Sequence, residues 1–586
     1  MDGTENGART TTNSVTNTQK DTMTSVVILA LAASVPIVVA FVLLAGLRWS
    51  AARSMGVGWV LATALAFAVW GMEPTAWAGA AVYGALEGLN IVLIVFGAIL
   101  LMNYLEVSGS IETIRWYFRR LERDRRIQLL LIGLGFETII EGVAGFGTPG
   151  ALAAPLFIGL GFPPLAAAVF GLFFNAPNPQ FGAAGTPIIG GVSQIESILP
   201  AAMAGGPFRQ LVSAWTGVMT GLTFAFWGLL GVFLLVYWFG DDDERSVRGA
   251  ARTAAPIAPF ALVLGGLTGA VQLAVAWFIG PALPDIAAGF AVLAVGVVMA
   301  DRGVLVPSER WTFPDRRGWL DEWLGGLDPS SLDTEEPRKR MPVWMAWAPY
   351  VAVALVLLVT RWPTLDLVSV LQGFTVGPYW IFGYETMEWS LAYLYLPGTM
   401  PFLPVAVLTG LFYRMDAGEM ADAWVESGRQ VATAAVTLVV AVSLTQVMIQ
   451  SSINPTDTIG MMNVLSLVLA EGAGAALPVV APWIGALGTF VTGSNTTSDI
   501  LFNALQYNAA ADVGISRALV VAIQNVGGGV GNMISVLNIA AISGVIGIAG
   551  REGDILRKVV VPTVVFALFV GVVGSLLVYV VAPGVF

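Results

Sequence analysis

Apolar stretches long enough to cross a bilayer recur along the whole chain, separated by polar breaks. Clear examples are Val26–Leu47, Trp77–Met102, Leu211–Phe239, Met345–Thr360 and Val559–Val581. They are continuous blocks of Leu, Val, Ala, Phe and Gly rather than segments of alternating polarity, and a backbone in hydrocarbon must satisfy its own hydrogen bonds. The pattern therefore predicts an all-α polytopic membrane protein with about 12–14 transmembrane helices, and it argues against a transmembrane β-barrel.

The polar breaks contain basic residues and so predict an orientation. The densest arginine cluster lies within Arg115–Arg126, and a second basic cluster is Arg338–Arg340. Because basic loops stay on the cytoplasmic side, we expect these breaks in the cytoplasm and both chain termini outside the plasma membrane. The tail 1–24 is rich in Thr and Asn and lacks the features of a removed signal peptide, so it is predicted to be extracytoplasmic.

The longest polar excursion divides the chain. Residues 301–341 contain many Pro, Arg and Asp residues, and they predict a cytoplasmic connector between an N-terminal membrane half, 25–300, and a C-terminal membrane half, 342–586. The polar and aromatic stretch Trp362–Trp389 is expected outside, where Trp and Tyr suit the membrane interface.

Composition narrows the chemistry. Apolar residues make up 56% of the chain and charged residues 11%, with a mean hydropathy of +0.78, so lipid is the natural solvent. The chain has no Cys and no His, which removes disulfides, thiolate nucleophiles, imidazole catalysis and Cys or His metal sites. Proton chemistry must then fall to carboxylates. No P-loop is present, and we expect no cofactor and no nucleic-acid partner, only a small solute, its coupling ion and membrane lipid.

Two apolar runs of the first half are interrupted by residues that do not suit a lipid-facing helix. The first run contains Glu137 and Glu141, which are four residues apart and share a helical face, and then breaks near 142–149 with three glycines, Thr148 and a proline. The second breaks near 175–187, where three prolines accompany Asn and Gly residues. Continuous helices are not expected in either place.

The second half repeats this arrangement. Breaks are predicted near 485–498, which is rich in Gly, Ser and Thr, and near 524–533, which contains four glycines. The spacing also matches, since Gly147 to Gly182 and Gly493 to Gly528 are both 35 residues apart. Paired interruptions in two repeat-like halves are typical of discontinuous or re-entrant helices that meet at a substrate site in the middle of the membrane.

The broken segments contain no Lys or Arg, so a bound anion would depend on helix N-termini, hydroxyl groups and amides. The candidate substrate-binding residues are Gly145, Gly147, Thr148, Asn175, Gln180, Gly493, Ser494, Asn495, Thr496, Ser498, Gln524, Asn525 and Asn532. The candidate proton-coupling residues are Glu141, Glu137 and Asp499. No catalytic residue and no metal ligand is predicted.

Each candidate also has a plainer interpretation. Single glycines in membrane helices more often serve close helix packing than function. Glu137 is as well explained by a position near the interface, and Asp499 by a charge in the first turn of a helix. Glu141 is different, because a carboxylate within a span is costly and by default marks a functional site.

The same residues resemble the L-lactate permease family. The first-half likeness lies in Phe136–Pro149, in the run from Gly159 to Leu165 and in Phe181–Ile188; the second lies in Gly485–Phe502 and Gly528–Ile534 and continues to Lys558. The resemblance implies proton-linked uptake of lactate, often with glycolate, on an all-helical fold. In some relatives Asp stands at the position of Asn495, Asn at that of Asp499 and Lys at that of Asn532, so charge compensation of the substrate differs here.

These observations favour a secondary transporter that imports lactate- or glycolate-type 2-hydroxy-monocarboxylates by proton symport, with Glu141 carrying the proton. A sodium-coupled organic-anion symporter, with Asp499, Asn495 and Asn525 around the ion, stays open as an alternative. A membrane-embedded enzyme is less favoured, because Glu137 and Glu141 are its only candidate acid–base pair. A passive channel is also less favoured, and no enzymatic activity is expected.

Overall fold

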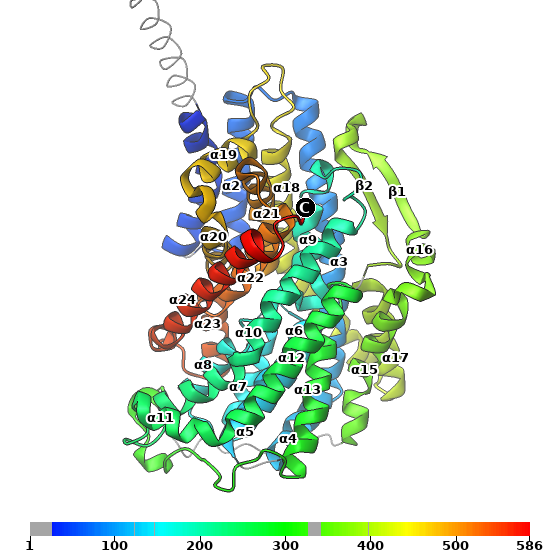
Figure 1. Ribbon diagram of the computed structural model, residues 1–586. Coiled ribbons are helices and arrows are strands. Elements are labelled where there is room, and N and C mark those ends of the chain that lie inside the picture. Colours follow the sequence, from blue (N-terminus) through cyan, green and yellow to red (C-terminus); the bar gives the residue numbers. More distant parts are fainter. Residues whose placement is uncertain (1–25, 48, 122–123, 146, 326–340, 397) are drawn as a thin grey trace, which may run out of the picture.

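The computed structural model describes residues 26–47, 49–121, 124–145, 147–325, 341–396 and 398–586, and they form a helical bundle (Figure 1). Eleven helices in these ranges are long and apolar enough to cross a membrane, and three shorter apolar helices accompany them, namely Thr148–Gly159, Pro164–Phe173 and Met400–Phe412. The predicted all-α polytopic class is confirmed. Short helices that reach only part of the way across account for the difference from 12–14 full spans.

The first half contains two long helices, α3 (Pro74–Val107) and α10 (Pro207–Phe239), with a series of shorter ones between them. After the first helix, Val26–Leu44, come α2 (Ala51–Ala68), α3, α4 (Ser110–Leu121), α5 (Arg125–Leu130), η2 (Leu131–Phe136), α6 (Glu137–Val143), α7 (Thr148–Gly159), α8 (Pro164–Phe173), η3 (Pro179–Phe181), α9 (Gly182–Ser193) and α10. The half ends with α11 (Val247–Ala254), α12 (Ala258–Phe278) and α13 (Pro284–Asp301).

The second half has a similar order. Its elements are α14 (Asp321–Leu324), α15 (Val343–Arg361), α16 (Leu367–Gln372), α17 (Leu403–Phe412), α18 (Ala417–Gln450), α19 (Met461–Ala473), α20 (Leu477–Thr492), α21 (Asn495–Val513), α22 (Arg517–Asn532), α23 (Val536–Val545) and α24 (Glu552–Leu576). The stretch predicted to lie outside contains part of a hairpin of two antiparallel strands, β1 (Thr375–Trp380) and β2 (Glu388–Ala392).

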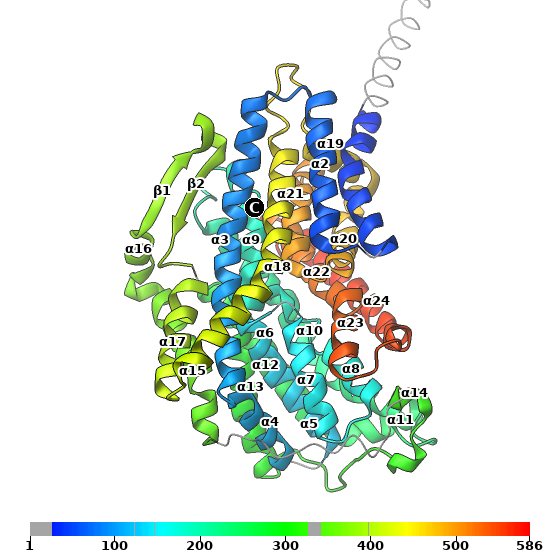
Figure 2. The same cartoon turned by 180° about the vertical axis from the view of Figure 1, so that it is seen from behind.

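The two long helices α3 and α18 have 34 residues each and pack along one another. They run in opposite directions, because α3 leads towards α4 at one end of the molecule and α18 leads towards α19 at the other (Figures 1 and 2). The broken hairpin of α6 and α7 lies in the part of the molecule near α5, and that of α20 and α21 lies in the part near α19 (Figure 2). The two hairpins therefore lie towards opposite ends of the molecule.

Backbone geometry explains three of the breaks. Between α6 and α7, Gly145 and Gly147 have φ of 60° and 78°, and between α20 and α21, Gly493 has φ of 73°. Side chains rarely adopt this left-handed region, so glycine lets the chain reverse here. The beginning of α9 is also irregular, since Ala183, Ala184 and Gly185 all have positive φ.

The structure differs from the prediction at 524–533, where α22 is continuous and the chain leaves the helix only after Asn532. A Cβ atom on Gly527 would overlap Pro482 of α20, and one on Gly531 would overlap Ala486 of the same helix. These glycines therefore allow α20 and α22 to pack closely. The break itself comes at 533–535, immediately before α23.

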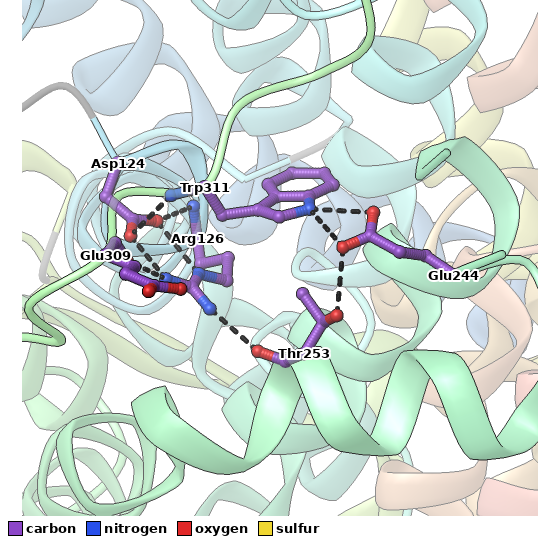
Figure 3. A network of polar contacts seen from close by, with 6 residues as sticks. All are labelled: Asp124, Arg126, Glu244, Thr253, Glu309 and Trp311. Carbon is purple, nitrogen blue, oxygen red and sulfur yellow. Dashed lines mark hydrogen bonds and ion pairs between the residues drawn. The ribbon is translucent and has the colours of Figure 1, made fainter. Parts of the chain in front are cut away.

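A buried polar network ties the described part of the predicted connector to the helix ends beneath it (Figure 3). Arg126 forms a paired ion contact with Asp124, at 2.6 Å between Nη2 and Oδ2 and 3.0 Å between Nε and Oδ1. The backbone N–H of Trp311 donates to Asp124, and its indole N–H donates to Glu244 at 3.0 Å. Residues 326–340 of the connector, which include the second basic cluster, lie outside the described residues.

Replacing Asp124 by alanine is expected to destabilise the protein by about 3–5 kcal/mol, because the buried Arg126 guanidinium would lose its counter-charge. The side chains of Asp124 and Arg126 are only 0% and 4% exposed. Equilibrium unfolding of the purified protein in detergent would measure the loss. Asp242→Ala is the matched control, since that side chain is 92% exposed beside Arg245, and equal stability of the two variants would contradict the assignment.

Candidate functional site

A small cavity lies where the broken segments of both halves meet. Its volume is about 20 Å³, room for about one water molecule, within about 280 Å³ of space that includes open solvent. Its wall comes from residues at or next to all four breaks. The lining residues are Glu141, Gly145, Gly147, Pro179, Gly182, Ala183, Pro187, Gly493, Ser494, Asn495, Thr496 and Asn532. The structure thus brings together seven residues predicted to bind substrate or couple protons in the two hairpins, with Asn532 from the end of α22.

Glu141 supplies the carboxylate of this cavity from the last turns of α6. The side chain is 2% exposed, and its Oε2 accepts a hydrogen bond of 2.7 Å from the Asn175 amide. Gly182 lies directly against it, since a Cβ atom there would overlap the Glu141 carboxylate. The absence of a side chain at Gly182 therefore makes room for the carboxylate.

A chain of amides connects Glu141 to the second half. The Asn532 side-chain amide donates to Oδ1 of Asn175, and the Asn538 side-chain amide donates to Oδ1 of Asn532 at 2.5 Å. Asn175 follows α8, Asn532 ends α22 and Asn538 lies on α23, so the chain crosses from one half to the other. The sequence prediction missed Asn538, although an Asn within the apolar run after Ser535 was a usable signal.

Two helix N-termini open near the cavity. Gly147 precedes α7, and Ser494 precedes α21, where its Oγ accepts a hydrogen bond from the Thr497 N–H at 3.2 Å. Unpaired N–H groups and the positive dipole end of a helix favour an anion. Gly147, Ser494, Asn495 and Thr496 line the cavity, and Thr148 lies next to Gly147 without lining it.

Other predicted residues lie behind the wall of the cavity. The Ser498 hydroxyl donates to the Gly485 carbonyl and accepts from the Gln524 amide. Asn525 accepts from Asn495 at 2.9 Å and donates to Thr216 of α10. The Gln180 amide donates to the Val526 carbonyl at 3.3 Å. These bonds hold the elements around the cavity together.

Four carboxyl groups are buried in this region. Glu137, Asp285 and Asp499 are 0% exposed, and Glu141 is 2% exposed. In the described part of the chain, the carboxylate oxygens of Glu137 and Asp499 accept no hydrogen bond of normal geometry. The Gln524 side chain lies beside the Asp499 carboxylate. Glu137 and Asp499 therefore depend on the surrounding protein, not on solvent, for their charge state.

Asp285 was not predicted. It begins α13, its Oδ1 accepts from Gln272 at 2.6 Å, and its Cβ lies where a side chain on Gly142 would be. The helix α13 thereby packs against the hairpin next to Glu141. The signal was present in the sequence, since Asp285 is a carboxylate in an apolar run, as Glu141 is.

Known proteins resemble the chain along nearly its full length. The chain is 29% identical to the glycolate permease GlcA and to the L-lactate permease of Escherichia coli (strain K12), in each case over 94% of this chain and 96% of the relative. It is 29% identical to the L-lactate permease of Bacillus subtilis (strain 168), over 93% of this chain and 95% of the relative.

Among solved structures, the YdaH transporter of Alcanivorax borkumensis aligns over 86% of this chain and 87% of its own, with a TM-score of 0.41 and 15% identity. MtrF of Neisseria gonorrhoeae aligns over 85% and 82%, with a TM-score of 0.40 and 13% identity.

The family profile described as L-lactate permease matches residues 29–581. This range includes both membrane halves, the four breaks and every residue that lines the cavity. The chain is an integral membrane protein that belongs to the L-lactate permease family.

Proposed function

We propose that this protein imports lactate- or glycolate-type 2-hydroxy-monocarboxylates together with a proton, and that Glu141 carries the proton. The observation that supports this most directly is that one cavity contains a carboxylate, Glu141, and receives two helix N-termini, at Gly147 and Ser494. The printed names of the E. coli relatives, glycolate permease and L-lactate permease, agree with this substrate class.

The proposed binding mode follows from the donors around the cavity. The substrate carboxylate is held at the start of α21, by backbone N–H groups and the hydroxyl groups of Ser494 and Thr496. The start of α7 contributes its dipole, because the Thr148 N–H is bonded to the Gly145 carbonyl and Pro149 has no N–H. The substrate hydroxyl is held by the Asn532 amide, whose partner Asn175 is bonded to Glu141. Helix ends therefore compensate the negative charge of the substrate, because the described residues in the wall of the cavity include no cationic side chain.

Coupling then follows from electrostatics. A charged Glu141 and a substrate carboxylate in one buried cavity would repel each other strongly in the low dielectric of the membrane. Protonation of Glu141 removes this repulsion and leaves a neutral carboxyl that can still bond to Asn175. Proton and anion therefore bind cooperatively, and the loaded site moves across the membrane with no added negative charge.

Counterflow in proteoliposomes tests this function. Vesicles loaded with unlabelled lactate should take up labelled lactate and glycolate, and pyruvate and acetate test the need for the 2-hydroxyl group. The internal and external pH and the sodium concentration are varied separately. Counterflow that is absent for all four acids would overturn the proposed substrate class.

Sodium coupling is the second candidate, and a row of oxygens along one helix supports it. On α21, both oxygens of Asp499 and the amide oxygens of Asn495, Asn503 and Gln506 are buried and accept no hydrogen bond from the described residues. Asp499 and Asn503 both face Gly191 of α9. Carboxylate and amide oxygens suit a hard cation such as sodium.

If a proton is the coupling ion, lactate uptake driven by a pH gradient should persist in sodium-free vesicles. Asp499→Asn should retain that uptake within about threefold, because a near-isosteric change away from the cavity wall is expected to cost less than about 1 kcal/mol. Asp512→Asn, at the exposed end of the same helix, is the control. Uptake that requires sodium and disappears in Asp499→Asn alone would replace the proton by sodium in the proposal.

A further inference from the structure

A second cavity, larger than the central one, lies on the other side of α9. Its volume is about 110 Å³, within about 670 Å³ of space that includes open solvent. Pro187 of α9 lines the central cavity and Ile189, less than one turn further, lines the second. Pro281, which also lines the second cavity, packs against Gly185 at the irregular start of α9. One short helical segment therefore separates the two cavities.

Two arginines line this second cavity. Arg209 lies in the first turn of α10, and Arg361 is the last residue of α15. The central cavity has no cationic lining residue, so the two cavities differ in charge. The second cavity adjoins the stretch that follows α15 and includes Gln372, Tyr395 and Leu396 in its wall, and the sequence predicts that this side of the protein faces outwards.

A carboxylate lies at the edge of the second cavity, since Glu196 accepts a hydrogen bond from the N–H of the lining residue Gly205, but it forms no ion pair with either arginine in the described ranges. In the described ranges, no ion pair involves either guanidinium, and Glu87 of α3 acts on Arg209 only as a longer-range charge. The two guanidinium groups lie within electrostatic reach of each other. Two like charges beside one enclosed cavity repel each other, and an anion between them would reverse that cost.

Arg361 is held in place but keeps bonding capacity. It is 8% exposed, its guanidinium lies 3.8 Å from the centre of the Tyr395 ring, and one of its N–H groups donates to the Tyr395 carbonyl. Among the described residues, its Nε is buried without a partner, and so is the Nε of Arg209. A planar guanidinium with free N–H groups matches the two oxygens of a carboxylate.

We propose that this cavity, between Arg209 and Arg361, is a second binding site for a small carboxylate anion, from which the cargo passes α9 to the central cavity. The identity of the anion as the cargo rests on the proposed function, whereas the existence of the site rests on the two arginines and the cavity. The site concentrates the anion before it reaches the central cavity, where a helix end, hydroxyl groups and an amide must hold it without a cationic side chain among the described residues.

Equilibrium binding of labelled lactate to the purified full-length protein tests the site, with inorganic phosphate as competitor. We expect two lactate molecules per chain, and Arg209→Gln should weaken one of them about tenfold or more, as expected for the loss of a charged hydrogen-bond donor. Arg209 makes no hydrogen bond or ion pair in the described chain, so this variant should fold. Arg361→Gln is the second variant, and Arg248→Gln, exposed on α11, is the control.

A single class of lactate site that Arg209→Gln leaves unchanged would overturn the second site and leave the proposed function intact. Preferential displacement of the Arg209-sensitive class by phosphate would also overturn it, because the cavity would then select phosphate rather than a carboxylate. Gly182→Ala should remove lactate binding at the central cavity and leave the lactate binding that depends on Arg209. That result would support the second site independently of transport through the central cavity.

Discussion

Replacing Glu141 by glutamine is expected to abolish accumulation of lactate driven by a pH gradient while counterflow continues. Glutamine resembles the protonated carboxyl in shape and retains an oxygen that accepts from Asn175, so the loaded site can still form. It cannot release a proton, so the proton gradient no longer drives net uptake. In the wild type, counterflow should fall as pH rises because fewer Glu141 side chains are protonated; in the variant it should not depend on pH.

The measurement is the steady-state ratio of internal to external labelled lactate in proteoliposomes with an imposed pH gradient. This ratio should fall to about one, the value for passive equilibration, when the force that drove accumulation is removed. Glu106→Gln, an exposed carboxylate near the end of α3, should leave the ratio unchanged. Undiminished accumulation in Glu141→Gln would show that another group carries the proton, and Glu137 and Asp285 would be the next two to replace.

Replacing Gly182 by alanine should lower transport at least about tenfold, because one added methyl group would occupy the space of the Glu141 carboxylate. Gly182 has φ of −59°, which alanine adopts without strain. The expected defect therefore comes from contact with Glu141 and not from the backbone. Counterflow of labelled lactate measures it, and a fluorescence thermal melt checks that the variant folds.

The matched control is Gly266→Ala on α12, where an added Cβ meets no atom within 4 Å. This variant should transport as the wild type does and should be no less stable, since alanine favours a helix over glycine by about 1 kcal/mol. Normal counterflow in Gly182→Ala would mean that the Glu141 carboxylate does not need its observed position, and the proposed site would then be wrong.

The position of the cavity between the two halves of the chain explains why Glu141→Gln and Gly182→Ala are expected to impair transport. Each half contributes a broken hairpin and a second interrupted segment, and the hairpins approach the cavity from opposite sides. Because the site is formed only where both halves meet, a shift of either half changes the distance between the two helix N-termini. Transporters with inverted repeats use such a shift to expose one site to each side of the membrane in turn.

Local chemistry made part of the site predictable. Glu141 stood out because a carboxylate in an apolar run is costly, and Gly145, Gly147 and Gly493 stood out because clustered glycines interrupt helices. The break expected at 524–533 was placed too early, since the glycines of α22 serve packing against α20, which sequence alone does not distinguish from a break. Asp285 and Asn538 were missed because they lie outside the broken segments along the chain.

The sequence by itself determined that this chain is a multispanning helical protein, that its helices are interrupted in both halves and that Glu141 is buried. These properties depend on hydrophobicity, on glycine and proline geometry and on the cost of charge in lipid, all of which act over a few neighbouring residues. Only the tertiary structure decided which polar groups meet. Glu141 and Asn538 are linked through Asn175 and Asn532, and Arg209 faces the same cavity as Arg361, because distant helices pack together in a way that no local pattern specifies.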